Sequence, residues 1–501
     1  MPDIAFLPAH ELARRLRRRE LGSLELLEHY LARIGRLNPK VNAVIALDAE
    51  RARERARAAD DALARGEGQV WGPLHGLPMT VKESFNVAGL PTTYGYPAFA
   101  DSRAKDDAIT VQRLKAAGAV IFGKTNVPVA LADWQSFNPV YGTTSNPWDL
   151  ARTPGGSSGG SAAALAAGLT GLELGSDIGA SIRNPAHYCG VWGLKPTWGV
   201  VPQAGHELTP VPCADNIDIA AVGPLARSAF DLTLAMDVLC QPLSTCTPTG
   251  RVPLAWPTRG TPPRRCRVAI VSDDAEARVD APLREALARL ADFLRREGVH
   301  VDEQARPVDS AEAHAVYLHL LRAATGARFD DADYAAAQAR APRYAAGDTS
   351  YPARMDRGTT TGHREWVQMD QRRDRLRLQW AAFFERFDLL ICPTATTPAF
   401  VQNQQGQRWE RLIPVRAADG RTLQQPTTDA LFWAGYPGLV GLPACAVPLE
   451  LAREDSGGAP RLPVGAQIVG PAYGDMDVLA FARWLESEYR SFEPPALARA
   501  A

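Results

Sequence analysis

Residues 153–168 read TPGGSSGGSAAALAAG, a run of glycines and serines between a proline and an alanine-rich segment. Glycine tolerates backbone conformations and close approaches that other residues do not, and the segment SAAALAAG has a high helix propensity. The stretch therefore predicts a tight turn that leads directly into a helix. Four interpretations of this stretch are open. It could be a flexible linker, a phosphate-binding loop, the nucleophile elbow of a serine hydrolase, or a site that combines serine hydroxyls with backbone N–H groups.

Three of these interpretations fit poorly. A linker lacks ordered apolar flanks, whereas a helix-forming segment follows here directly. A P-loop needs the pattern G-x-x-x-x-G-K-[ST], and no lysine follows these glycines. The segment GGSSG at 155–159 matches the elbow pattern G-x-S-x-G, but that machinery needs an acid and then a histidine downstream. The last histidine is His363, and no histidine sits in a context that marks a triad member.

A second glycine and serine cluster follows in residues 172–199, which read LELGSDIGASIRNPAHYCGVWGLKPTWG. Upstream, residues 76–85 read GLPMTVKESF and place a lysine at the end of an expected strand. Serine is a poor nucleophile until a base takes its proton, and a neutral lysine is such a base. Burial lowers the pKa of a lysine toward neutrality. One lysine and two serine clusters therefore suffice for a hydrolase that uses no histidine.

These segments resemble the amidase signature family, the Ser-Ser-Lys amide hydrolases. The resemblance covers nearly the whole chain and is densest in residues 76–95, 117–128, 138–168 and 174–199, with further matches in GLPACAVPL and LPVGAQIVGP. It implies the amidase signature fold over residues 1–501. That fold is α/β: a single large domain whose mixed, mostly parallel β-sheet is covered by helices on both faces.

The resemblance also implies catalytic roles. Lys82 is the general base, Ser157 is the bridging serine, usually held with a cis peptide in this family, and Ser181 is the nucleophile that becomes the acyl-enzyme. The family usually has glycine where this chain has Ala180. The oxyanion hole is expected to consist of four consecutive backbone N–H groups, those of Ile178, Gly179, Ala180 and Ser181.

Other residues are expected to line the substrate pocket or to support the loops of the site. Leu131, Asp133 and Trp134 lie where the family lines its substrate pocket, although a tryptophan in the core explains Trp134 equally well. Structural support is expected from Ser158, Asp177 and Arg183, the last two as an ion pair. Without the resemblance, Lys82 reads as a solvated lysine at a strand end, and Ser157 and Ser158 read as turn formers.

Alternating strand and helix patterns support the α/β class. Residues 1–68 predict a helical segment, with two helices between 9 and 36 and a third over 49–65. Residues 70–240 form the expected catalytic core, and residues 245–265, rich in Pro, Thr and Arg, predict a surface connection. Residues 305–385 predict a variable, mainly helical region on the substrate side.

The bulk composition excludes several classes. The net charge of −1 argues against a nucleic-acid binder. Seven cysteines occur singly and form no CxxC pair, so neither a disulfide framework nor a zinc site is expected. Residues 431–449 carry no charge, but three prolines would break a helix there. We therefore expect a turn and short strands in the core, no membrane insertion and a cytoplasmic protein.

The expected activity is hydrolysis of a carboxylic acid amide to an acid and an amine or ammonia. The substrate is a small-molecule amide with an aryl or apolar acyl group, an anilide or a carbamate. No cofactor or metal is implied, and the resemblance suggests a homodimer. The alternative is the catalytic subunit of a glutamine-dependent tRNA amidotransferase, which works only with partner chains.

Overall fold

The computed structural model describes residues 3–65, 71–206, 216–240, 256, 259–452 and 461–499. The expected surface connection at 245–265 lies largely outside the described residues. Three helices form the expected N-terminal helical segment, and α2 extends beyond residue 36. These helices are α1 (Ala9–Arg17), α2 (Ser23–Val41) and α3 (Ala49–Ala64).

Eight strands form the main sheet, in the order β10-β9-β11-β15-β14-β7-β8-β6. The sheet is mixed, as expected. The expectation of mostly parallel pairing is wrong, because only the pairings of β9 with β10 and β11 are parallel in this sheet. Strands joined by a helix need not be neighbours: β8 lies between β6 and β7 and runs antiparallel to both. The strands are β6 (Glu173–Asp177), β7 (Trp192–Lys195), β8 (Ala221–Ala226), β9 (Arg267–Ile270), β10 (His300–Asp302), β11 (Leu389–Pro393), β14 (Ala444–Ala452) and β15 (Leu462–Val469).

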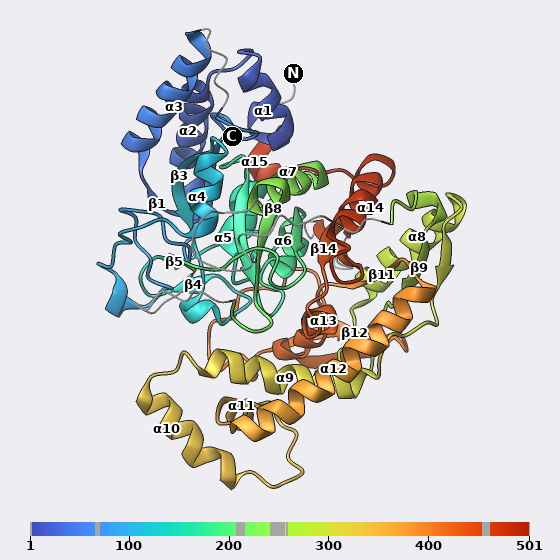
Figure 1. Ribbon diagram of the computed structural model, residues 1–501. Coiled ribbons are helices and arrows are strands. Elements are labelled where there is room, and N and C mark those ends of the chain that lie inside the picture. Colours follow the sequence, from blue (N-terminus) through green and yellow to red (C-terminus); the bar gives the residue numbers. More distant parts are fainter. Residues whose placement is uncertain are drawn as a thin grey trace.

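Helices cover the main sheet on both faces (Figure 1). Every residue of β6, β7, β8, β11 and β15 is buried. Successive side chains of a strand point to opposite faces, so neither face of these strands meets solvent. The helices that pack on the strands of the main sheet are α5 (Gly159–Ala166), α6 (Arg183–Cys189), α7 (Ala229–Leu239), α8 (Ala281–Arg296) and α14 (Asp475–Glu488). Of the other helices, α4 (Ile109–Ala116) packs on α7, α13 (Leu431–Gly438) packs on α9, and the short α15 (Ala496–Arg499) follows α14 in the chain.

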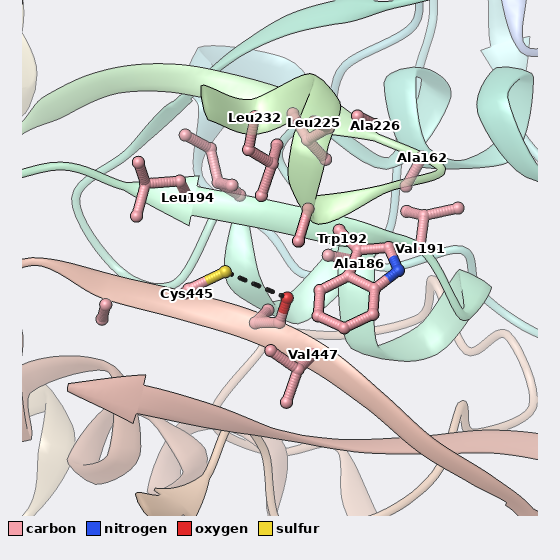
Figure 2. Close-up of a cluster of buried hydrophobic side chains, with 14 of the residues drawn as sticks. Ala162, Ala186, Val191, Trp192, Leu194, Leu225, Ala226, Leu232, Cys445 and Val447 are labelled. Atoms are coloured by element: carbon pink, nitrogen blue, oxygen red, sulfur yellow. Dashed lines mark hydrogen bonds between the residues drawn. The ribbon is translucent and has the colours of Figure 1, made fainter. Parts of the chain in front are cut away.

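The core is packed between these layers. Figure 2 shows Trp192 of β7 near Leu225 of β8 and Val447 of β14, with Leu232 of α7 nearby. All four side chains are at most 1% exposed. Burying apolar area of this kind contributes roughly 25 cal/mol per Å², so this packing stabilises the strands next to the candidate site.

A smaller sheet places the lysine strand beside the main sheet. Its order is β1-β3-β2, and β2 packs against β6. The carboxyl end of β2 therefore lies next to the carboxyl end of β6, where the second glycine and serine cluster begins. The strands are β1 (Val44–Leu47), β2 (Pro78–Lys82) and β3 (Val120–Thr125); the remaining short strands pair as β4 (Phe137–Asn138) with β5 (Gly142–Thr143) and β12 (Leu412–Arg416) with β13 (Thr422–Pro426).

Four helices form a layer at the end of the molecule opposite α1 and α3 (Figure 1). The first of them, α9, packs against α11, α12 and α13. Its side chains Val316, Tyr317, Leu320 and Leu321 are buried, so this layer is anchored through α9. The helices are α9 (Ser310–Gly326), α10 (Asp331–Arg340), α11 (Tyr351–Thr359) and α12 (His363–Arg386).

The uncharged stretch 431–449 differs from its prediction. Residues 431–438 form the helix α13 rather than a turn, and a strand follows from Ala444. Pro437 removes the hydrogen bond that would reach the carbonyl of Trp433, but Gln467 Nε2 donates to that carbonyl at 2.8 Å. A hydrogen bond from a residue distant in the sequence thus supports a helix that the local sequence disfavours. Among the described residues, no helix has the length and apolar character needed to cross a membrane.

Candidate active site

Lys82 and Ser157 meet at the junction of the two sheets. Lys82 ends β2, and Ser157 lies in the turn before α5, after a cis Gly156–Ser157 peptide bond. Lys82 Nζ lies 2.7 Å from Ser157 Oγ and 2.9 Å from Ser176 Oγ. Both distances are within hydrogen-bond range. The lysine amine therefore faces two hydroxyls, and it forms no ion pair with a carboxylate of the described residues.

Burial governs the charge of this lysine. Lys82 is 0% exposed. Burial lowers the pKa of Lys82 well below its ordinary value, Asp177 works in the opposite direction, and the charge of Arg328 lowers the pKa further. A neutral amine accepts a proton, whereas an ammonium does not. The site thus favours the neutral form of the Lys82 amine, which can accept a proton.

The glycines of the opening stretch let this turn approach its neighbours. A Cβ on Gly156 would lie 2.2 Å from the carbonyl oxygen of Asp133, and one on Gly160 would lie 2.3 Å from the amide nitrogen of Asn126. No side chain fits at such distances. Ser158 precedes α5, and its amide donates to the carbonyl of Ser181 at 3.1 Å. The turn is therefore tied directly to the second serine cluster.

Residues 178–181 form a tight turn after β6. Ala180 adopts a left-handed backbone with φ of 66°, a region that favours glycine. The amide of Ala180 donates to Asp177 Oδ1 at 2.9 Å, so this N–H is not free in the described structure. By contrast, the amides of Ile178, Gly179 and Ser181 have no acceptor among the described residues. Three of the four backbone N–H groups expected in the oxyanion hole are therefore free to bind an oxyanion, and the fourth, that of Ala180, stabilises the turn.

A buried ion pair fixes the same turn. Arg183 Nε and Nη2 each lie 2.9 Å from the carboxylate oxygens of Asp177. Burial opposes the charge of Asp177, but the ion pair with Arg183 holds its pKa below the ordinary value. Arg183 also donates to Gln467 Oε1 at 2.7 Å. The pair anchors the start of α6 directly behind Ser181.

A cavity of about 170 Å³ opens onto the serines. Ser157, Ser176 and Ser181 line it together with the three residues expected to bind substrate. Two of those three make specific contacts: Trp134 Nε1 donates to the carbonyl of Gly179 at 2.8 Å, and Asp133 pairs with Arg411 at 2.5 Å. The third is Leu131, which has a left-handed φ of 58°.

Other lining residues had no signal in the sequence analysis. His206 is buried, packs on Phe85 at 4.6 Å between ring centroids, and has no hydrogen-bond partner at either ring nitrogen among the described residues. Arg322, Arg328 and Arg408 come from distant segments. Only Ser176 was within reach of sequence reasoning, because it lies beside Asp177 in the second cluster. No three His, Cys, Asp or Glu side chains gather at a site suited to a metal ion in the described part of the chain.

A protein-family profile described as Amidase matches residues 25–479. The chain belongs to the amidase signature family. One relative is a glutamyl-tRNA(Gln) amidotransferase subunit of Streptomyces coelicolor, 32% identical, with 95% of this chain and 94% of the relative covered. Another is the indoleacetamide hydrolase of Bradyrhizobium diazoefficiens, 30% identical, with 96% and 86% covered.

Solved structures agree with this membership. A crystal structure of an amidase is 30% identical and superposes with a TM-score of 0.74, covering 96% of this chain and all of that one. The amidase signature fold, with its large mixed sheet between helices, is therefore the fold of this chain. Relatives carry names of two kinds, amide hydrolases and amidotransferase subunits.

Proposed function

We propose that this protein hydrolyses a carboxylic acid amide through an acyl-enzyme on Ser181, with Lys82 as base and Ser157 as the bridging group. The observation that carries the proposal is the 2.7 Å contact between Lys82 Nζ and Ser157 Oγ, in a cavity that Ser181 also lines. Family membership supplies the reaction class, amide C–N cleavage.

The proton moves along the three side chains. Neutral Lys82 takes the proton of the Ser157 hydroxyl, which takes the proton of Ser181 as the Ser181 oxygen attacks the amide carbonyl. The carbonyl oxygen gains negative charge and is held by the free N–H groups of Ile178 and Gly179, with Ser181 as a third donor. Each such donor is typically worth about 10²–10³ in rate.

The same relay then runs in reverse. Protonated Lys82 returns a proton through Ser157 to the amide nitrogen, and the C–N bond breaks to release the amine or ammonia. Amide nitrogen leaves poorly until it is protonated, so this second transfer matters as much as the first. Water then attacks the Ser181 ester, its proton passing to the relay, and frees the acid and the serine.

The cavity wall supports an aryl or apolar acyl group. Apolar side chains on this wall include Leu131, Trp134, Phe400 and Leu431. A pocket of this kind binds an apolar body and uses a few polar groups to orient it. The relative named indoleacetamide hydrolase is consistent with an aryl substrate.

A second candidate is the amide-cleaving component of a tRNA amidotransferase. Several relatives of 31–32% identity over most of the chain carry the name of a glutamyl-tRNA(Gln) amidotransferase subunit. Such a component is expected to need partner chains. Turnover of simple amides by the purified chain alone favours the independent amidase, and turnover only with partner chains favours the second candidate.

Replacing the nucleophile tests the mechanism. We expect Ser181→Ala to lose activity on the order of 10⁶-fold, because removing one member of a concerted unit removes the whole effect. A liquid-chromatography screen of aliphatic amides, aryl amides, anilides and carbamates identifies the substrate on which this loss is measured. An unchanged thermal unfolding curve controls for the fold.

A sulfonyl fluoride gives a second readout of the same assignment. Peptide mass mapping of the labelled wild type should place the adduct within residues 178–183, and Ser181→Ala should not be labelled there. An adduct at Ser157 or Ser158 contradicts the assignment, as does more than a per cent of residual activity in uncontaminated Ser181→Ala.

A further inference from the structure

Three arginines line the cavity, and no carboxylate of the described residues pairs with them. Arg322 lies near the end of α9, Arg328 follows that helix, and Arg408 precedes β12. None of them forms an ion pair within the described residues. A buried guanidinium normally has a carboxylate or another anion beside it, because a lone charge is costly to remove from water.

Arg322 is the most deeply buried of the three, whereas Arg328 and Arg408 are half-buried. It is 7% exposed, and its Nε has no hydrogen-bond partner among the described residues. Its guanidinium contacts the hydroxyl of Tyr351 and lies 5.3 Å from the centre of that ring. Arg408 lies 5.9 Å from the same ring and donates to the carbonyl of Ala132. Among the described residues, Arg322 and Arg408 thus form hydrogen bonds and ring contacts only with neutral groups.

The acidic residues of the cavity do not neutralise this wall. Asp133 is paired with Arg411 at 2.5 Å, and Asp177 is paired with Arg183 at 2.9 Å. Each of these pairs contributes no net charge. The unpaired charge facing the cavity is consequently positive, and no unpaired carboxylate among the described lining residues faces it to receive an ammonium group.

We propose that the amide substrate carries a carboxylate, which Arg322, Arg328 and Arg408 bind while the amide group lies at Ser181. This rests on the proposed amide hydrolysis and specifies its substrate. The planar guanidinium donates two parallel hydrogen bonds to a carboxylate, and the free Nε of Arg322 supplies one unused donor. The wall suits a monoanion rather than a zwitterion such as glutamine, whose ammonium would meet unpaired arginines.

Binding to the Ser181→Ala protein tests the anion subsite without turnover. Pentanamide, glutaramic acid and glutamine share a five-carbon amide; they end in a methyl, a carboxylate, and a carboxylate with an α-ammonium. Calorimetry measures the affinity of glutaramic acid and of its longer homologues up to suberamic acid. We expect at least one of these acids to bind at least about tenfold tighter than its methyl-ended counterpart and than glutamine. The reason is that charge-assisted hydrogen bonds form only with the anion. On the amine side, 4-acetamidobutanoate and N-butylacetamide form the matching pair.

Matched variants assign the preference to this wall. Arg328→Gln removes a charge at a half-buried position whose side chain donates no hydrogen bond among the described residues. Arg364→Gln removes a charge from an exposed position of α12 that does not line the cavity. In the Ser181→Ala background, we expect Arg328→Gln to reduce the preference for the carboxylate by about tenfold, and Arg364→Gln to leave it unchanged.

The outcomes separate this proposal from the one on which it rests. Equal affinity for the charged and the uncharged member of every pair overturns the anion subsite, as does an equal effect of the two arginine variants. A carboxylate preference that Arg328→Gln abolishes supports the subsite even if the wild type cleaves none of these amides. In that case only the proposed hydrolysis fails.

Discussion

At the scale of single residues, Lys82 is distinguished by its partners more than by its burial. Lys124 and Lys195 are also buried, and burial lowers their pKa values to about 8 and about 7. Lys124 donates to the carbonyl of Pro91 and to Thr92 Oγ1, and Lys195 donates to the carbonyl of Pro196 at 2.9 Å. None of these three partners lines the substrate cavity. Of these three lysines, only Lys82 faces serine hydroxyls in the substrate cavity.

Replacing Lys82 separates a base from an electrostatic role. Lys82→Arg keeps a positive charge that is not shed at working pH, and Lys82→Ala leaves Ser157 without a base. If Lys82 is the base, both variants are nearly inactive and Arg is no better than Ala. Steady-state kinetics on the screened amide measures this, and a cooperative thermal transition shows that each variant folds.

The pH profile supports the same distinction. The base must be neutral, so kcat/KM should rise with pH along an acid limb that reports loss of a proton from the free enzyme. The pKa of that limb should lie below the ordinary lysine value, because burial lowers the pKa of Lys82. An active Lys82→Arg enzyme would mean that the lysine stabilises charge rather than accepting a proton.

At the scale of elements, Gln467 of β15 joins four parts of the fold. Its Nε2 donates to the carbonyls of Trp433 in α13 and Pro393 in β11, each at 2.8 Å. Its Oε1 accepts from Arg183 at 2.7 Å. Gln467 is 0% exposed. The side chain therefore satisfies the carbonyl freed by Pro437 and holds the arginine behind the nucleophile turn.

Gln467→Leu preserves much of the volume and removes these hydrogen bonds. We expect a loss of roughly 3 kcal/mol in the free energy of unfolding, because buried carbonyls and a guanidinium N–H lose their partners. Denaturant unfolding measures it. Gln112→Leu changes an exposed glutamine of α4 and should stay within about 0.5 kcal/mol. Equal effects of the two variants would show that Gln467 is not such a junction.

At the scale of the whole molecule, the cavity is assembled from both ends of the chain. The proposed base, Lys82, ends β2 and the proposed nucleophile, Ser181, follows β6, whereas the three arginines come from residues 322–408. The four-helix layer at the far end of the molecule thus contributes to the cavity through α9 (Figure 1). The proposed catalytic residues and the proposed carboxylate-binding arginines therefore lie on separate parts of the fold.

The buried lysine also affects global stability. Its folded pKa is lowered, so between that value and the ordinary value of about 10.4 the unfolded chain binds more protons than the folded one. Stability contributed by this group therefore rises with pH across that window. The slope approaches about 1.4 kcal/mol per pH unit.

Lys82→Met removes this contribution. We expect the free energy of unfolding of the wild type, measured by denaturant titration at several pH values, to rise with pH relative to that of Lys82→Met across the window. The difference between the two proteins isolates Lys82 from other buried groups, such as Glu173, whose pKa burial raises to about 8. Parallel curves would show that Lys82 has an ordinary pKa.

The local sequence was sufficient to predict the features that depend on residues close together in the chain. Helix-forming segments predicted α1, α2 and α3, and the family motifs located Lys82, Ser157 and Ser181, whose catalytic roles remain predictions. These signals are local because helix periodicity and turn chemistry depend on residues only a few positions apart. The same local rules failed at α13, where Pro437 predicted a break.

Tertiary structure alone decided the rest. It set β8 between β6 and β7, supplied Gln467 to the carbonyl that Pro437 frees, and placed the amide of Ala180 on Asp177. It also brought three arginines to one cavity wall while leaving them without carboxylates among the described residues. Strand adjacency, hydrogen-bond satisfaction and net cavity charge are properties of groups that meet across the fold, and a sequence position carries no record of the distant group it will meet.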